Sequence, residues 1–235
     1  RMAAHAAADR GRAADRGDAQ ERKGTDLDGT GRGGTDCGEA GFGGTESAGA
    51  EGAPEGRGKD GREPVIGVAV RLWHPAKSEL EAIAEALRLL LDELPVRIRF
   101  LPFHPPKDEE ASRFVMERLG EAYAGRVGMG PVSDDPIVMF REVAACDLLI
   151  GMRLHSLIYA ACLRIPMVGI SYDPKIDHFL HRLDMSAAGS ADHLDPKAVA
   201  QAVRKLLADR EAWVREKDPL VRELQQKSQL PAKHI

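Results

Sequence analysis

The chain has 235 residues and a formal net charge of −4, which suits one or two domains and lacks the basic excess of a nucleic-acid-binding protein. No stretch approaches the ~20 apolar residues of a membrane span, and the first residues lack the apolar core of a signal peptide. The three cysteines lie far apart, as is typical of unpaired thiols in a reducing compartment. We therefore expect a cytoplasmic protein with no transmembrane segment and no nucleic-acid partner.

Residues 1–63 differ in composition from the rest of the chain. They contain 16 of the 24 glycines and short repeats such as AADRG and GGTD, but almost no large apolar side chains. Such a segment cannot bury enough apolar surface to offset the entropy that it would lose on ordering. We expect residues 1–63 to be disordered and residues 64–235 to form the folded domain.

Apolar strands and amphipathic helices alternate along residues 64–235. The expected strands are 65–70, 96–103, 127–129, 147–150 and 167–171, and the expected helices are 78–93, 108–119, a helix capped by Asp134 or Asp135 and ending near Ala145, 152–164, 176–183 and a helical region from about 196. Ser78 and Glu81 have the spacing of a capping box at the start of the first helix. This alternation predicts an α/β fold, a Rossmann-like parallel sheet with helices on both faces, for which about 170 residues suffice.

Ligands of such sheets bind outside the carboxyl ends of the strands. That rule selects four loops, which are 71–75, 102–107, 151–155 and 171–175. The charged and titratable side chains that are unusual for their surroundings fall in these loops: Arg71, His74, His104, Arg153, His155 and Lys175. The sequence therefore predicts a binding site at this edge of the sheet.

The loop 151–155 combines a glycine with two side chains that bind anions. Gly151 permits a tight turn from strand to helix, and the first helical turn offers unpaired N–H groups at the positive end of the helix dipole. An anion held by Arg153 and His155 would offset the repulsion that cations experience at a helix N-terminus. The alternative is that Arg153 pairs with a carboxylate on a neighbouring loop and that His155 caps a carbonyl.

Lys175 follows the expected strand 167–171 and would lie one loop away from His155. Lysine is a common partner of phosphate, and the alternative is a solvated lysine beside Asp173 or Asp177. The chain has no P-loop, no G-x-G-x-x-G and no G-x-S-x-G motif. His178 and His181 form an H-x-x-H pair, but no carboxylate or cysteine set accompanies them to complete a metal site. We therefore expect no metal ion, and we expect no cofactor.

The segment GMRLHSLIYAACLRIPMVGISYDPKIDHFL, residues 151–180, resembles the signature of the polysaccharide pyruvyl transferase family, specifically the CsaB type. The family pattern is a strand, then G-M-R-L-H at the start of a helix, then P-x-x-G-I-S-Y-D-P-K. The chain matches it at Gly151, Met152, Arg153, Leu154, His155, Pro166, Gly169, Ile170, Ser171, Tyr172, Asp173, Pro174 and Lys175. The stretch VIGVAVRLWHP, residues 65–75, is similar to the start of that family's C-terminal domain.

The resemblance implies a fold similar to GT-B glycosyltransferases, in which two Rossmann-like domains face a cleft. Residues 64–235 would form only the C-terminal, donor-binding half. The implied donor is phosphoenolpyruvate, and the implied acceptor is a lipid-linked cell-wall glycan whose N-acetylmannosamine receives pyruvate as a ketal. In Gram-positive bacteria such ketals on secondary cell-wall polysaccharide anchor S-layer proteins, which implies a peripheral position at the inner face of the membrane; a homo-oligomer is compatible with this interpretation.

By the same resemblance, Arg153 and His155 grip the donor while Lys175 lies near its phosphate or carboxylate. His155 and Lys175 are the candidate catalytic residues, with His155 either a proton donor or a purely electrostatic group. The candidate substrate-binding residues are Arg71, Arg153, Leu154, Ser171, Tyr172 and Asp173. Two alternatives stay open: half of a nucleotide-sugar glycosyltransferase or epimerase with this architecture, and a non-catalytic interaction module.

Overall fold

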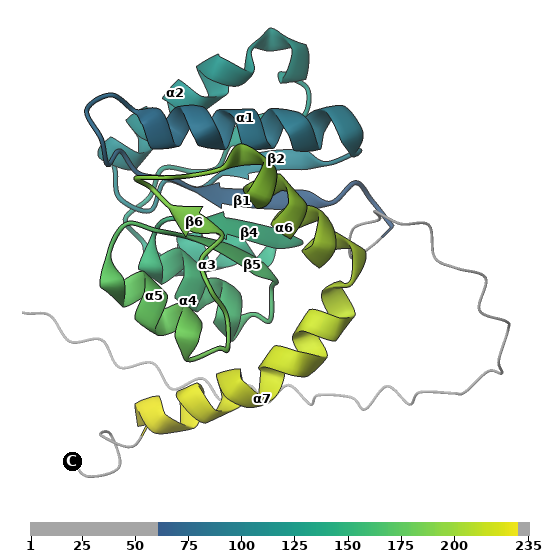
Figure 1. Cartoon of the computed structure of the whole chain (residues 1–235). Helices are drawn as coiled ribbons and strands as arrows, with labels where there is room; N and C mark the ends of the chain where they lie inside the picture. Colours follow the sequence, from purple (N-terminus) through teal and green to yellow (C-terminus); the bar gives the residue numbers. More distant parts are fainter. Residues whose placement is uncertain (1–60, 230–235) are drawn as a thin grey trace, which may run out of the picture. The chain divides into compact units, whose positions relative to one another are not determined.

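In the computed structural model, residues 61–229 are described, and they form a parallel sheet between two layers of helices (Figure 1). The segment expected to be disordered lies outside the described residues up to residue 60. Its last residues contact the domain, because an Arg62 guanidinium nitrogen lies 3.0 Å from Oδ2 of Asp147. None of the helices within residues 61–229 combines the length and the hydropathy that crossing a membrane requires.

The strands are β1 (Val65–Ala69), β2 (Arg97–Phe100), β3 (Val127–Met129), β4 (Leu148–Gly151), β5 (Met167–Ser171) and β6 (Gly189–Ser190). All neighbouring strands are parallel, in the order β3-β2-β1-β4-β5-β6. This is the strand order of the Rossmann fold, so the predicted α/β class is confirmed. The order reverses between β1 and β4, and a crevice for ligands forms at such a switch point.

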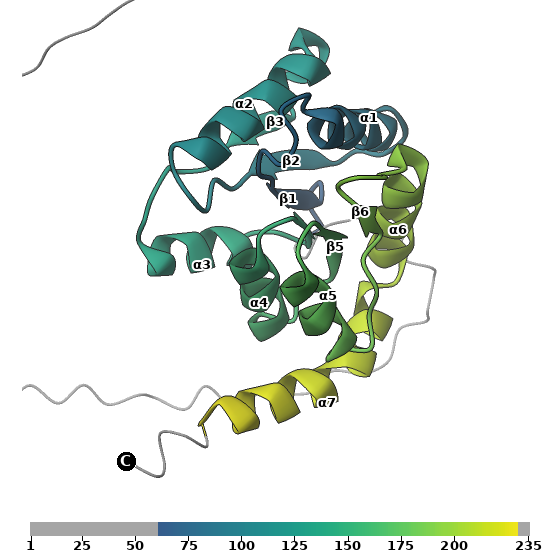
Figure 2. The same ribbon diagram turned by 60° about the vertical axis from the view of Figure 1, so that its left-hand side comes forward.

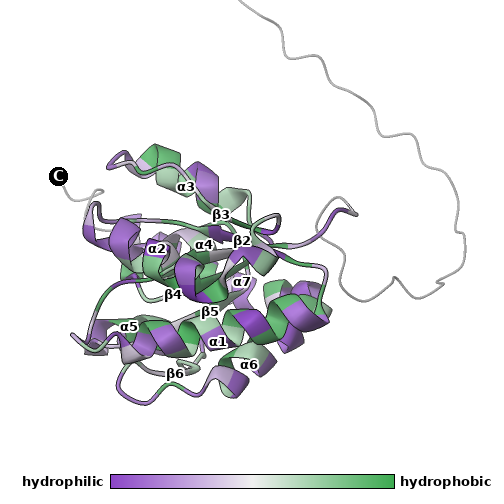
Figure 3. Cartoon of the chain, turned by 90° about the horizontal axis from the view of Figure 1, so that it is seen from above, coloured by the Kyte–Doolittle hydropathy of each residue, from purple (hydrophilic) through white to green (hydrophobic). Residues whose placement is uncertain are grey.

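Helices cover both faces of the sheet (Figure 2). One layer consists of α1 (Ser78–Glu93), α2 (Lys107–Leu119) and α6 (Pro196–Ala208). The other layer consists of α3 (Pro136–Ala144), α4 (Leu154–Cys162), α5 (Pro174–His181) and α7 (Arg210–Gln229). A short 3-10 helix, η1 (Glu121–Tyr123), follows α2. Alternate side chains of a strand enter opposite layers, as Ile150 and Leu149 of β4 do. Hydrophobic and hydrophilic residues alternate along α1 in Figure 3, since only one side of that helix faces the sheet.

The start of α1 differs from the sequence prediction. The residue before the helix is Lys77, with a left-handed φ of 57°. None of the described side chains caps the helix, so the predicted capping box of Ser78 is wrong. Glu79 has a different partner: its buried Oε1 accepts hydrogen bonds from the backbone N–H groups of Trp73 and His74, at 2.7 and 3.2 Å. Glu79 thereby anchors the loop that follows β1.

Candidate functional site

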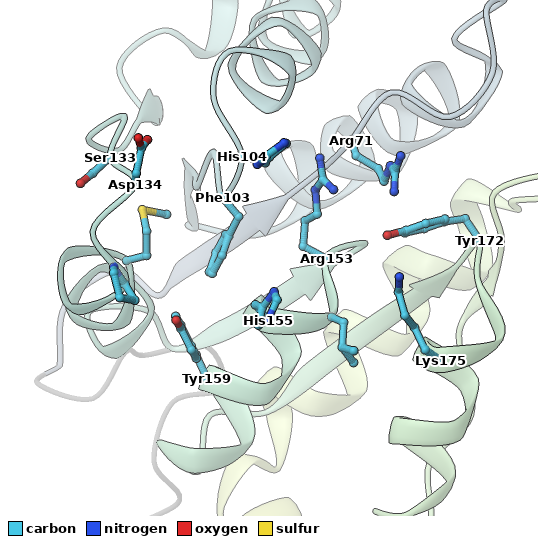
Figure 4. A pocket seen from close by; sticks show the side chains of 13 residues that line it. Arg71, Phe103, His104, Ser133, Asp134, Arg153, His155, Tyr159, Tyr172 and Lys175 are labelled. Atoms are coloured by element: carbon cyan, nitrogen blue, oxygen red, sulfur yellow. The ribbon is translucent and has the colours of Figure 1, made fainter.

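A cavity of about 550 Å³ lies at the carboxyl edge of the sheet, among the loops that follow the first five strands (Figure 4). Six of the eight candidate residues line it, namely Arg71, Arg153, Leu154, His155, Tyr172 and Lys175. The cavity therefore lies where the strand order predicts a ligand crevice. Its cationic side chains differ in how their charges are compensated.

Arg71 follows β1 and forms no salt bridge among residues 61–229, although its charge helps to lower the pKa of the Asp173 carboxyl. Its guanidinium carbon lies 4.3 Å from the ring centroid of Tyr172 and 5.4 Å from that of Trp73, which fixes the side chain by cation–π contact. Its Nε is buried and, among the described residues, has no hydrogen-bond partner. A buried donor of this kind carries a desolvation cost that a bound acceptor would remove.

Arg153 occupies the position before α4 and is held by a buried carboxylate. Its Nε donates to Oδ2 of Asp108 at 2.8 Å, and its Nη2 donates to Oδ1 of the same side chain. Asp108, which is fully buried at the start of α2, also accepts a hydrogen bond from the backbone N–H of His104 at 3.0 Å. The structure thus shows the carboxylate pairing that the sequence left open for Arg153. Within residues 61–229 its Nη1 has no hydrogen-bond partner, and the residue still lines the cavity.

Two histidines reach the cavity and a third does not. His155, in the first turn of α4, is exposed at the cavity, and the described part of the chain offers its ring no hydrogen-bond partner, so it does not cap a carbonyl there. His104, from the loop after β2, lines the same cavity. His74 lies outside the lining, with Nε2 2.8 Å from Oδ1 of Asp192.

The loop after β5 brings Lys175 into the lining but leaves Ser171 and Asp173 outside it. Asp173 caps α5 by accepting the backbone N–H of Lys175 at 3.0 Å, and its Oδ2 lies 3.0 Å from the Lys175 ammonium. The backbone hydrogen bond first, and then the ammonium, lower the pKa of the Asp173 carboxyl from its usual 3.8. Ser171 is buried and donates to Oδ2 of Asp177 at 2.6 Å. Substrate contact by Ser171 or Asp173 stays a prediction.

The sequence reasoning selected the loop after β2 but missed the part of the cavity formed by the loop after β3 and by Tyr159 of α4. Ser133 and Asp134 line it beside the rings of Phe103 and Tyr159, whose centroids are 5.7 Å apart. The sequence offered one indication of this region, because either Asp134 or Asp135 could cap α3 and the other would then be available to the cavity. The cap is Asp135, whose Oδ1 accepts from a backbone N–H of the first turn at 2.8 Å, and Asp134 is left for the cavity.

The family model for polysaccharide pyruvyl transferases matches residues 49–174, which is more than half of the chain. None of the curated proteins compared with the chain matches it. A putative UDP-N-acetylglucosamine 2-epimerase from Listeria monocytogenes is 9% identical with a TM-score of 0.49, and MnaA of S. aureus, solved with UDP, is 15% identical with a TM-score of 0.49. Each match covers 73% of this chain but only 46% of the other chain. The C-terminal domain of a group 1 family glycosyl transferase, LpcC from Francisella tularensis, is 14% identical with a TM-score of 0.48, covering 68% of this chain and 85% of that domain.

Proposed function

The chain belongs to the polysaccharide pyruvyl transferase family, and on that premise we propose that its cavity binds phosphoenolpyruvate as the pyruvyl donor. The acceptor in this proposal is a saccharide with two suitably placed hydroxyls. For the CsaB type it is the N-acetylmannosamine of a lipid-linked secondary cell-wall glycan, and the resulting ketal serves S-layer anchoring. This chain contributes the donor half, at the inner face of the membrane.

One observation carries the proposal: at the wall of the cavity, Arg71 forms no salt bridge within residues 61–229, and its buried Nε has no acceptor among them. Phosphoenolpyruvate has both a carboxylate and a phosphate, and either group could accept this hydrogen bond. The aromatic contacts hold the guanidinium in place before the donor arrives, so less side-chain entropy is lost on binding. Arg71 is therefore the main clamp, although the sequence alone favoured Arg153.

The other cations have more specialised parts in the proposal. Arg153 is oriented by Asp108, so it offers its remaining N–H groups in a fixed direction while its charge is already compensated. Lys175 can exchange Asp173 for the donor, because that ion pair is half-exposed and exposed pairs are weak. His155 lies near both as the candidate proton donor.

The chemistry requires two bonds to one carbon. The enol double bond of the donor takes a proton at its methylene carbon, and a sugar hydroxyl oxygen bonds to the central carbon while releasing its own proton. Phosphate then leaves with the electron pair of its C–O bond, and the second hydroxyl closes the ketal as its proton is released. His155 supplies the methylene proton as general acid, and Arg71 and Lys175 stabilise the anionic groups.

Calorimetric titration of the full chain with phosphoenolpyruvate tests this proposal. Arg71→Ala should weaken binding by about tenfold or more, since a hydrogen bond to a charged group contributes about 1.5–3 kcal/mol. Arg215→Ala, on the exposed surface of α7, is the matched control and should bind as the wild type does. A folded chain that binds UDP-sugars instead of phosphoenolpyruvate would support the nucleotide-sugar alternative and contradict the proposal.

A further inference from the structure

The cavity has two chemically different ends (Figure 4). Arg71 and Lys175, from the loops after β1 and β5, lie at one end, on the right of the view. Ser133 and Asp134, from the loop after β3, lie at the other, and the ring of Tyr159 rises from α4 below them. One end thus presents cations, and the other presents hydroxyls, a carboxylate and an aromatic ring.

Asp134 makes its end of the cavity unsuitable for an anion. Its carboxylate is exposed, and within residues 61–229 neither a hydrogen bond nor an ion pair engages it. The loop that presents it is anchored on both sides, because Asp135 caps α3 and donates its backbone N–H to Oγ of Ser133 at 3.1 Å. An ionised carboxylate only accepts hydrogen bonds, so it attracts hydroxyl donors and repels phosphates and carboxylates.

The aromatic wall adds a flat apolar surface. The ring centroid of Tyr159 lies 5.7 Å from that of Phe103 and 5.4 Å from that of Phe140, so neighbours hold its ring from two sides. In the described part of the chain its hydroxyl has no hydrogen-bond partner. A tyrosine in such a position offers an apolar face and a polar tip to the same ligand. A sugar ring presents the matching pair, an apolar C–H face and a rim of hydroxyls.

The size of the cavity allows both ligands at once. Pockets of about 300–1,000 Å³ hold drug-sized molecules, and the volume here is about 550 Å³. A small phosphate ester at the cationic end would leave the other end unfilled. We infer that a neutral saccharide ring occupies the Ser133, Asp134 and Tyr159 end, with a hydroxyl donating to Asp134 and the ring lying against Tyr159. The inference rests on the proposed function in treating that saccharide as the acceptor, and it adds acceptor contacts to the half that binds the donor.

Saturation-transfer NMR with the full chain tests the inference, using N-acetylmannosamine as the saccharide probe. The wild type should transfer magnetisation to the sugar. Asp134→Ala and Tyr159→Phe should each weaken sugar binding by about tenfold, because each removes one hydrogen-bonding group. Glu110→Ala, which removes an exposed carboxylate of α2 outside the cavity lining, is the matched control and should bind the sugar as the wild type does.

Phosphoenolpyruvate titrated in parallel separates this inference from the proposed function. Asp134→Ala should bind the donor as well as the wild type does, since the two ligands use opposite ends. Sugar binding that depends on Asp134 without any donor binding would contradict the donor proposal and leave the saccharide site supported. A folded chain that shows no transfer to the sugar, or equal transfer in Asp134→Ala, would overturn the inference, and so would transfer to uridine in place of the sugar.

Discussion

Arg71 and Arg153 lie in the same cavity, but different interactions hold them. Arg153 shares two hydrogen bonds with Asp108, a carboxylate without solvent exposure, whereas Arg71 rests against the rings of Trp73 and Tyr172. Truncation of Arg153 would leave the buried carboxylate of Asp108 without its partner. Truncation of Arg71 would break no salt bridge among the described residues. Truncation of Arg153 should therefore mainly lower stability, whereas truncation of Arg71 should mainly weaken donor binding.

Arg153→Ala should lower the free energy of unfolding by about 3–5 kcal/mol, the usual cost of leaving a buried charge without its partner. Arg71→Ala should change it by less than about 1 kcal/mol while weakening donor binding. Urea denaturation of both variants provides the comparison. Equal losses of stability would contradict the assignment of the ion pair as structural.

The sequence was sufficient to predict most of the cationic side chains that reach the cavity, but it missed Asp134 and did not show how the charges are paired. Arg71, Arg153, His155 and Lys175 follow buried strands, and parallel strands end at one edge, so their convergence is a consequence of topology. Asp108 is 45 residues from Arg153 in the chain, and no local pattern connects them. Their pairing depends on the start of α2 lying beside the loop that follows β4, which only the three-dimensional structure shows.

At the scale of single elements, α5 shows how a helix start positions a functional side chain. The helix begins at Pro174, after the cap Asp173, and thus two residues earlier than the sequence analysis placed it. An Asp cap followed by proline at the first helical position is a recognised start signal. The same arrangement places the ammonium of Lys175 beside the cap carboxylate.

Asp173→Asn should strengthen phosphoenolpyruvate binding by about two- to fivefold. Asparagine caps helices about as well as aspartate does, so α5 should stay folded while the carboxylate that competes for Lys175 is lost. Calorimetry on the wild type and the variant measures the difference. Weaker binding in the variant would instead support the predicted contact of Asp173 with substrate.

The lowered pKa of Asp173 also predicts a pH dependence. Because this pKa is below its unfolded value of 3.8, the capped and paired carboxylate contributes its full stability above that value. The contribution is lost as the pH falls through the folded-state pKa, below 3.8. Thermal unfolding between about pH 5 and about pH 2 should therefore decline less steeply in Asp173→Asn than in the wild type. Parallel curves for the two proteins would contradict this.

Strand boundaries were predictable only where apolar residues form a run. The runs VIGVAV and MVGIS gave β1 and β5 to within one residue, because both layers of helices bury these strands completely or nearly so. Gly189 and Ser190 carry no apolar signal, and β6 was missed. The predicted strand 96–103 ends at Phe100, since the chain beyond it turns into the cavity loop.

At the scale of the whole molecule, the cavity and the buried part of α7 lie at opposite ends of the strands. Trp213 of α7 is buried and lines a separate hollow beside Met167, the first residue of β5, whereas the candidate site lies beyond the last residues of the strands. The indole Nε1 of Trp213 is buried and, among the described residues, has no hydrogen-bond partner. Packing of this helix should therefore affect stability without changing the ligand site.

Trp213→Phe should be close to neutral for stability, because the lost packing is offset by removal of an unsatisfied buried donor. Trp213→Ala should lower the free energy of unfolding by about 3–5 kcal/mol, since it leaves a large cavity. Denaturant titration measures both, and phosphoenolpyruvate binding by Trp213→Phe should equal that of the wild type. A large loss of stability in Trp213→Phe would indicate that the indole N–H has a partner in solution.

The short outer strands of the sheet have a consequence for how the protein behaves at high concentration. The sheet ends in β3, with three residues, on one side and in β6, with two residues, on the other. Long exposed edges recruit strands from other molecules, because their free N–H and C=O groups form a template for further pairing. Edges of two or three residues offer few such groups. The long apolar strands lie inside the sheet, so the folded domain should resist edge-to-edge aggregation.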